Sequence, residues 1–404
     1  MEILLLLFIY SGLLKGYLLF LGTSFPIDVT VFTLILIFVK FGFDSIIKKK
    51  TIVFSKSYEN SIFLLVLFYL WIIFTLIYTP SIHYSFQKAG FFGLNFIAFS
   101  LPLLHGNVNV KKFIKGFIII SISCGLAYLP FQFLYQLGEM SLTPIDQLDS
   151  VSGMYLQIGE YLGLSLVLCV TSKRLWKSNL IQYLIGWTCF IILILIGARG
   201  PLIFVVIIVI FTLIINKNLK FNFIFSIDSY IKIVIVSILV FVIYSYNSQY
   251  IDVLFERTFS RFMVLSENDS SNKSAIARIE FLEVSFHHIF KNPIVFLFGN
   301  GIGSFGILVF NEDIRAYPHN IFLEIFFELG FLGILIFFFW IFFSIKNMKG
   351  KNQFISILVL IYLCMNFLKS SSIIDIRLFF IIFAFYISDN KINSNSNENI
   401  TYIS

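Results

Sequence analysis

The chain has 404 residues, of which 58% are hydrophobic and only 13% are charged. Soluble domains carry about 25% charged residues, so this composition excludes an ordinary soluble enzyme and predicts an all-α polytopic membrane protein. The formal net charge of +7 comes from lysines in separate short segments. Such a distribution does not indicate a nucleic-acid-binding surface.

Apolar runs recur along the chain, and we expect about twelve transmembrane helices because each run is long enough to cross the hydrocarbon core. The predicted spans are 3–22, 27–43, 60–79, 89–106, 113–134, 152–171, 180–197, 201–216, 226–245, 321–345, 354–368 and 377–388. The predicted organisation is therefore transmembrane helices over 1–245, a long loop over 246–320, further transmembrane helices over 321–388, and a disordered tail over 389–404.

The lysines predict the orientation of the chain in the membrane. They cluster after the even-numbered spans as far as the tenth, whereas the loop after the fifth span carries acidic residues and no lysine. Because positive charge accumulates in cytoplasmic loops, this pattern places both termini in the cytoplasm and the loop 246–320 on the outer side.

The arginines are distributed differently and mostly follow the outer ends of predicted helices. A guanidinium group can grip a phosphate or carboxylate at two points, so outer arginines are candidates for binding an anionic ligand. Arg199 lies in a tight turn over 197–201, beside the start of the eighth span, where a helix N-terminus also favours anions. For Arg257, Arg261 and Arg315, pairing with acidic residues of the same loop is the alternative interpretation.

The sixth span contains a carboxylate, Glu160, well inside the predicted helix. A charge at such depth is costly and indicates either a salt bridge within the bundle or a role at a binding site. No metal site, disulfide or cofactor is expected from the cysteines, because they have no metal-ligand spacing. They are Cys124, Cys169, Cys189 and Cys364.

The loop 246–320 carries the richest polar sequence. Helical spacing of apolar residues from Ser274 to Lys291 predicts an amphipathic helix, lying either on the outer bilayer surface or over the mouth of the bundle. Arg278 lies in its first turns, and Asn-Pro at 292–293 is a stop signal. Four glycines within 299–306 predict a bend and a close approach to another segment. The match to the dinucleotide pattern GxGxxG is rejected because no βαβ unit surrounds it.

The loop closes with Tyr317-Pro318-His319-Asn320 and leads into the tenth span. This position places His319 at the mouth of the bundle, near the outer arginines, and favours a functional role over a purely structural one. Glu324 and Glu328 follow four residues apart, so they share one face of the predicted helix.

The order of these motifs resembles that of the O-antigen polymerase/ligase family, over roughly residues 150–345. The first motif is Ala-Arg-Gly at 198–200, and the second is the amphipathic helix whose basic head is Ala277-Arg278-Ile279-Glu280 and which ends in Asn-Pro at 292–293. The glycine bend follows, and then Pro-His-Asn-x-x-Leu-Glu from Pro318, continued by Glu-Leu-Gly-Phe-Leu-Gly. The resemblance implies a GT-C-like bundle in the bacterial inner membrane with a periplasmic active site. It implies a glycosyltransferase that uses a glycan carried on undecaprenyl diphosphate and requires neither a metal nor another cofactor.

The resemblance also implies roles for individual residues. Arg199 and Arg278 would bind the donor diphosphate, and His319 would act catalytically with Arg278 near the acceptor hydroxyl. Candidate supporting residues around them are Glu160, Tyr317, Asn320 and Glu324.

Two members of this class remain open. A polymerase transfers the growing glycan to another lipid-linked repeat unit and a ligase transfers it to lipid A-core; the Pro-His-Asn form favours a polymerase. Expected partners are the undecaprenyl-diphosphate-linked oligosaccharide and the bilayer, with a chain-length regulator protein as a candidate and no nucleic acid. The alternative of another class is a transporter or flippase of lipid-linked oligosaccharide, which would show repeat symmetry and broken helices. Neither is evident in the sequence.

Overall fold

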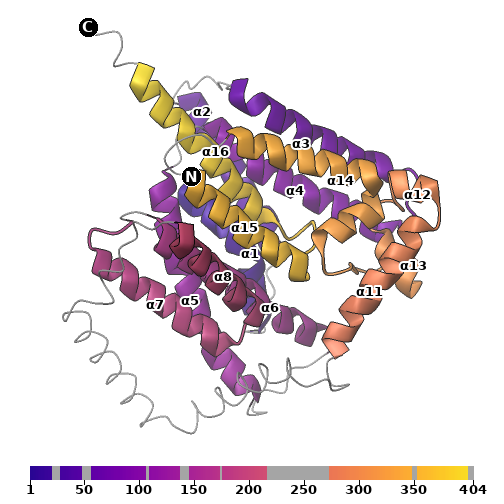
Figure 1. Ribbon diagram of the computed structural model, residues 1–404, viewed down its shortest axis with the longest axis horizontal. Coiled ribbons are helices and arrows are strands. Elements are labelled where there is room, and N and C mark those ends of the chain that lie inside the picture. The colour runs from indigo at the N-terminus through magenta and orange to yellow at the C-terminus, as the bar shows by residue number, and fades with distance from the viewer. Residues whose placement is uncertain are drawn as a thin grey trace. The chain divides into compact units, whose positions relative to one another are not determined.

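A computed structural model describes residues 1–20, 28–47, 56–105, 109–136, 145–172, 175–215, 273–347 and 353–398. Every regular element in these ranges is a helix (Figure 1). The helices are α1 (Glu2–Phe20), α2 (Val29–Ile47), α3 (Lys56–Thr75), α4 (His83–His105), α5 (Val110–Gln136), α6 (Ile145–Thr171), α7 (Asn179–Ile196), α8 (Arg199–Ile215), α11 (Lys273–Phe290), α12 (Pro293–Phe298), α13 (Ser304–Phe310), α14 (Ile321–Asn347), α15 (Gln353–Ser370) and α16 (Arg377–Glu398).

The predicted spans coincide with these helices, except for 226–245, which lies outside the described residues. In the described part, five helices are long and apolar enough to cross a membrane. They are Glu2–Leu19, Val110–Pro130, Gly153–Thr171, Asn179–Ile196 and Ile321–Lys346. Shorter apolar helices lie at Glu59–Thr75, Arg199–Thr212, Phe354–Lys369 and Arg377–Ile387. These features describe an all-helical, multi-pass membrane protein, and the count of about twelve spans stays a prediction.

The end of the chain differs from the expectation of a disordered tail from residue 389. Helix α16 continues to Glu398, although Asn and Ser are weak helix formers. Once the apolar first half of α16 has formed, each added residue gains a hydrogen bond without a new nucleation step, which accounts for the extension. Residues 399–404 lie outside the described residues.

The chain divides into two compact units. The first comprises Met1–Leu18, Gly22–Gly116 and Asn272–Ser404, and the second comprises Leu19–Leu21 and Phe117–Ser271. In the first unit α14 packs against α3, α11 and α12, and α16 packs against α4. In the second unit α6 packs against α7 and α8.

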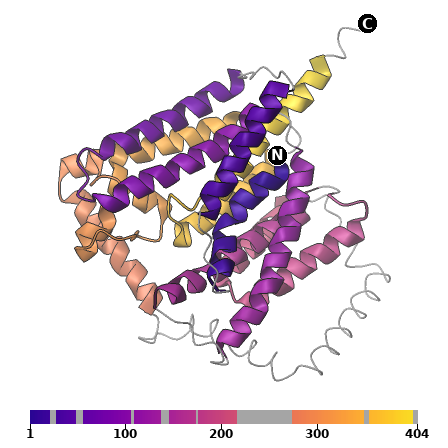
Figure 2. The same cartoon turned by 180° about the vertical axis from the view of Figure 1, so that it is seen from behind.

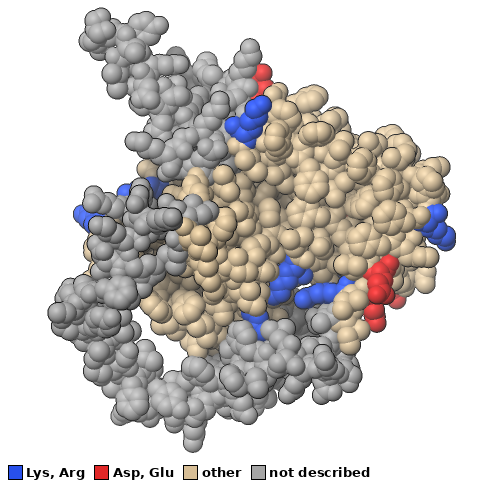
Figure 3. Space-filling model, in the orientation of Figure 1, with Lys and Arg blue, Asp and Glu red and all other residues tan. Residues whose placement is uncertain are grey.

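The core of the first unit is aromatic and centres on Trp340 of α14, which is fully buried. Its ring lies 5.5 Å from Phe99, 5.0 Å from Phe380 and 5.4 Å from Phe383, measured between centroids. Outside this core, many large apolar side chains are exposed, and the face in Figure 3 carries few charges. Lipid-facing helices have this character, because hydrocarbon rather than water covers their outer surface.

Candidate active site

The segment that carries His319 runs from the end of α13 to the start of α14, and an acidic residue holds its first part. Asp313 accepts hydrogen bonds from Ser81 Oγ at 2.7 Å and from the backbone N–H groups of Ile82, His83 and Tyr84 at 3.0, 2.7 and 3.3 Å. These groups form the start of α4, so Asp313 caps that helix from a distant part of the chain. Burial opposes the charge of Asp313, but the hydrogen bonds from Ser81 and the backbone hold its pKa below the ordinary value.

An ion pair between one guanidinium nitrogen and both oxygens of a carboxylate holds the middle of the same segment. Arg315 Nη2 lies 2.9 and 3.1 Å from the two carboxylate oxygens of Asp375, in the connection between α15 and α16. The expected acidic partner of Arg315 therefore exists, but it lies in a distant connection and not in the same loop. Burial, together with the charge of Asp375, raises the pKa of the neighbouring Tyr317 to about 12.

His319 has a backbone conformation that is uncommon for residues other than glycine. Its φ of 57° lies in the left-handed region. The imidazole stacks on Phe281 of α11, with centroids 6.0 Å apart, and meets the edge of Tyr317 at 4.7 Å. Asn320 then caps α14, because its Oδ1 accepts from the N–H groups of Phe322 and Leu323. Tyr317 thus contacts the imidazole of His319, and Asn320 anchors the next residue to the start of α14; their supporting roles stay a prediction.

The structure brings His319 and Arg278 together. Arg278 lies on α11 one turn before Phe281, the residue whose ring stacks on His319. Burial, followed by the positive charge of Arg278, lowers the pKa of His319 below its ordinary value. The imidazole is therefore neutral at neutral pH, which leaves one ring nitrogen free to accept a proton. Helix α11 itself confirms the predicted amphipathic helix, although it begins at Lys273 rather than after a cap at Ser274.

Arg199 belongs to the second unit. Gly197 ends α7 in the left-handed conformation, with φ 72° and ψ 27°, and Arg199 begins α8, as the tight turn predicts. Ala198 packs directly on Gly159 of α6, where an added Cβ would collide with it. Glu160 comes directly after Gly159 in the chain, and Arg199 comes directly after Ala198. That Arg199 converges with Arg278 and His319 stays a prediction, and Arg257 and Arg261 lie outside the described residues.

The glycine bend approaches another segment closely, as predicted, and that segment is a break in α14. Gly330 has φ 69° and ψ −170°, which interrupts the helical hydrogen-bond ladder. Asn300 N–H donates to Phe327 O at 2.9 Å, and Gly301 N–H donates to Glu328 O at 2.8 Å. The bend therefore satisfies carbonyl groups that the break would otherwise leave unpaired inside apolar surroundings.

Residues around the end of α3 close the same junction. Trp71 Nε1 donates to Leu329 O at 2.9 Å, and Thr79 Oγ1 donates to Ile302 O at 2.8 Å. An added Cβ at Gly301 would collide with the backbone of Thr79, so only glycine fits this approach. The sequence did not predict the break in α14, whose apolar pattern runs without interruption through Gly330.

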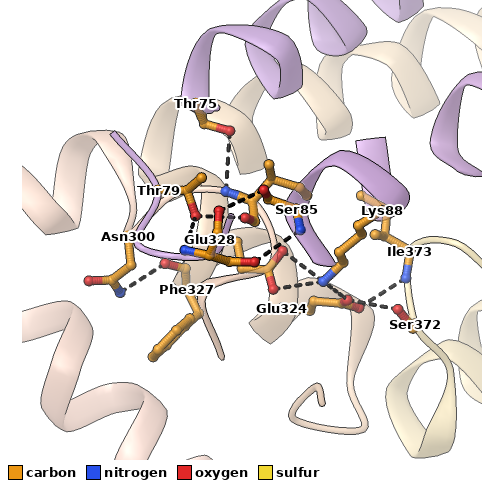
Figure 4. Close-up of polar contacts among 12 residues, drawn as sticks. Thr75, Thr79, Ser85, Lys88, Asn300, Glu324, Phe327, Glu328, Ser372 and Ile373 are labelled. Atoms are coloured by element: carbon orange, nitrogen blue, oxygen red, sulfur yellow. Dashed lines mark hydrogen bonds and ion pairs between the residues drawn. The ribbon is translucent and has the colours of Figure 1, made fainter. Parts of the chain in front are cut away.

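Below His319, a buried ion cluster joins three segments (Figure 4). Lys88 Nζ of α4 lies 2.5 Å from Glu324 and 2.6 Å from Glu328, both on α14. Glu324 also accepts from Ser372 Oγ at 2.7 Å and from Ile373 N–H at 2.9 Å. All three ionic side chains are fully buried or nearly so. This arrangement confirms that Glu324 and Glu328 share a face.

Lys88 is not among the residues predicted from the sequence, because the predicted span begins at residue 89. One signal could have pointed to it: two carboxylates on one face of an apolar helix require a buried cation nearby. Among the described residues, no three His, Cys, Asp or Glu side chains are grouped as a metal site. The expectation that the chain needs no metal remains a prediction.

Residues 184–338 match the family model described as O-antigen ligase. Over this part of the chain, the sequence is therefore similar to the O-antigen polymerase/ligase family. No protein among the curated sequences matches the chain. The match supports the resemblance found in the motifs and a role in polysaccharide polymerisation or ligation, which is a glycosyl transfer.

The O-antigen ligase match covers only part of the candidate site. It includes Arg199, Arg278 and His319, together with the break in α14. Lys88 and Asp375, which hold α14 and the segment before it, lie outside 184–338. The residues that hold the candidate site of the first unit in place thus come from segments both inside and outside the family match.

Proposed function

We propose that this protein is a polysaccharide polymerase of the bacterial inner membrane. It transfers a growing glycan from undecaprenyl diphosphate to a lipid-linked repeat unit at the periplasmic face. The observation that carries the proposal is the position of His319 near Arg278, just before an apolar helix, where burial and then the positive charge of Arg278 lower the pKa of the imidazole. A proton acceptor next to a phosphate-binding cation is what transfer from a sugar diphosphate requires.

The chemistry divides between these groups. The acceptor hydroxyl attacks the anomeric carbon of the donor sugar, and the bond from that carbon to the diphosphate oxygen breaks. His319 takes the hydroxyl proton, and the lowered pKa keeps its nitrogen available for that step. Negative charge grows on the leaving diphosphate, where Arg278 and, by prediction, Arg199 stabilise it through forked hydrogen bonds. The products are the extended glycan, the free carrier diphosphate and the released proton.

The proposed topology has about twelve transmembrane helices in a GT-C-like bundle, both termini in the cytoplasm, and a metal-independent site outside. The lysine distribution supports this orientation, and the coincidence of predicted spans with helices supports the count. A chain-length regulator protein is a candidate partner of this arrangement.

A ligase is the second candidate, and the description of the matching family favours it. The third candidate is a transporter, for which the break in α14 at Gly330 is the relevant observation. However, Asn300, Gly301 and Trp71 already occupy the carbonyl groups that a broken helix would offer to an ion. The break therefore favours a structural junction, and an enzyme over a transporter.

Reconstitution separates the three candidates. The purified protein in vesicles is given lipid-linked repeat units alone, and the products are resolved by length. A ladder of longer glycans supports the polymerase, product only after lipid A-core is added indicates the ligase, and translocation without product indicates the transporter. His319→Ala should give no ladder, whereas His287→Ala, which changes an exposed histidine on α11, should leave it intact.

A further inference from the structure

Helix α11 has three distinct faces. One of them packs on the protein: Ile289 is fully buried in a cluster with Phe305 and Phe327, and Phe281 packs against that cluster. Ser285, on the same face, donates to the carbonyl of Phe281. This face fixes α11 to α13 and α14, so the other two faces have a defined orientation.

The remaining surface of α11 divides into two stripes. The apolar stripe consists of Ile279, Leu282, Phe286 and Phe290, all exposed, with Ile279 at 59% and Phe290 at 63% of their full exposure. The charged stripe consists of Glu280, Glu283 and His287, which are also exposed, and the exposed Lys291 follows directly after the helix. At about 100° per residue, the apolar stripe lies between the packed face and the charged stripe. In water, a row of four large exposed apolar side chains is an unfavourable surface.

The apolar stripe continues onto the candidate membrane span α14. Phe286 stacks on Phe290 with centroids 6.0 Å apart, and Phe290 lies 5.7 Å from Phe296 of α12. Phe296 stacks in turn on Phe331 of α14 at 5.8 Å. Phe331 is exposed and lies within the apolar stretch Ile321–Lys346. A continuous row of rings thus joins the exposed stripe of α11 to the exposed surface of a helix that is long and apolar enough to cross a membrane.

The same surface continues onto α3. Phe298 of α12 lies 6.0 Å from Trp71, and its carbonyl accepts a hydrogen bond from Tyr78 Oη at 2.6 Å. Ile294 of α12 is 66% exposed, and Phe74 of α3 is exposed as well. Figure 1 and Figure 2 both show α12 beside the ends of α3 and α14. The short apolar helix α12 therefore extends the exposed apolar surface of α3 and α14.

We propose that α11 and α12 lie at the boundary between membrane and water, with the apolar stripe inserted among phospholipid chains and the charged stripe in water. The occupant of this surface is the bilayer, because the stripe is continuous with the membrane face of α14 and is bordered by charged residues on its far side. Aromatic rings are also the side chains that favour this depth.

This position has a consequence for the candidate site, which rests on the proposed function. Arg278 lies on α11 itself, and His319 stacks on Phe281 of the same helix. A helix at the membrane boundary holds both groups at the depth of lipid phosphates. The diphosphate of a lipid carrier would then reach them by lateral diffusion, with its polyprenyl tail still in the membrane.

The test uses the full-length protein with its four cysteines replaced by alanine and a single cysteine added for a bimane label. Labels at Leu282 and Phe286 probe the apolar stripe, and labels at Glu280 and His287, on the charged stripe of the same helix, are the matched controls. A label at Phe338, exposed on α14, is the control for lipid contact. Each variant is reconstituted into phosphatidylcholine and phosphatidylglycerol vesicles and quenched with brominated acyl chains or with aqueous iodide.

Brominated lipid should quench the labels at 282, 286 and 338 several-fold more than those at 280 and 287, and iodide should show the reverse order. Iodide access to all four α11 labels without quenching by brominated lipid would overturn the proposal and place the helix over the bundle mouth. Protection of 282 and 286 from both quenchers would indicate a protein partner and would overturn it as well. If Leu282→Cys fails to give a monodisperse protein, Ile279→Cys tests the same stripe. Because no step requires catalysis, the result stands apart from the fate of the proposed function.

Discussion

Lys88 Nζ lies 2.6 and 2.7 Å from the two carboxylate oxygens of Glu328, although the residues are 240 positions apart in the chain. Both side chains are buried, and Glu328 lies in the apolar stretch Ile321–Lys346, which is long enough to cross a membrane. An ion pair in such surroundings requires both partners, because a single remaining charge cannot be hydrated. The pair fixes the first turns of α14, directly below His319.

Replacing Lys88 with methionine should destabilise the protein by about 3–5 kcal/mol, because two buried carboxylates would lose their cation. Unfolding in mild detergent, followed by circular dichroism, measures the loss. The variant that combines Lys88→Met with Glu328→Gln should recover part of the stability, since it removes one unpaired charge. Strictly additive losses in the two changes would show that the residues do not interact.

The chain-extension rate should depend on His319 and on pH. Burial and Arg278 lower the pKa of His319, so the imidazole loses its proton at a pH below the ordinary value of about 6.5. The rate should therefore rise with pH through this lowered pKa and level off above it. Arg278→Gln removes the neighbouring positive charge, which should raise the pKa and move the rise towards higher pH. A pH profile that is identical in the two proteins would exclude coupling between these residues.

Arg278→Ala should reduce the chain-extension rate by about a hundredfold or more, because the charge of the leaving diphosphate loses a preorganised donor.

Arg199→Lys tests whether forked binding matters, since lysine keeps the charge but not the planar geometry. The rate is measured with lipid-linked repeat units after confirming equal amounts of protein in the membrane. Full activity of Arg199→Lys would count against phosphate binding by the guanidinium fork.

Gly330→Ala should destabilise the first unit. The φ of 69° disfavours any side chain, and an added Cβ would collide with the backbone of Gly299 and Leu297. Strain of this kind costs about 1–3 kcal/mol before any displacement of the neighbouring segment. Gly90→Ala is the matched control, because Gly90 lies in α4 with open space around it and alanine favours a helix. A Gly330→Ala variant as stable as Gly90→Ala would contradict the structural role of the break.

Most of the helices could be predicted because they depend on local apolar runs of membrane length, which the chain carries at 180–197 and 321–345 with little interruption. The break at Gly330 could not be predicted in this way. Its stability depends on donors from Asn300 and Gly301, which lie outside any local window. The extended tail of α16 was missed for a related reason, since composition alone does not account for growth from an established helix.

The candidate site shows the same division. Arg278 and His319 came from motif order, and their proximity in the structure agrees with it. Lys88 and Asp375 belong to no sequence motif. They lie near the site only because the folded chain places Lys88 of α4 against Glu328 of α14, and Asp375 against Arg315. Sequence patterns therefore indicated the chemical groups, whereas the side chains that hold them in position required the fold.

The break at Gly330 also separates α14 into two helical stretches, one before and one after it, so that a change of rotation in one stretch is not passed to the other. In an unbroken helix, one inserted residue turns everything beyond it by about 100° and shifts it by about 1.5 Å. With the ladder open at Gly330 and its carbonyls held by Asn300 and Gly301, a residue inserted after Leu335 would reorient Trp340 and leave Glu324 where it is. The part of α14 after Gly330 can thus vary in length or twist with the thickness of the membrane, while the orientation of the His319 imidazole before α14 stays unchanged.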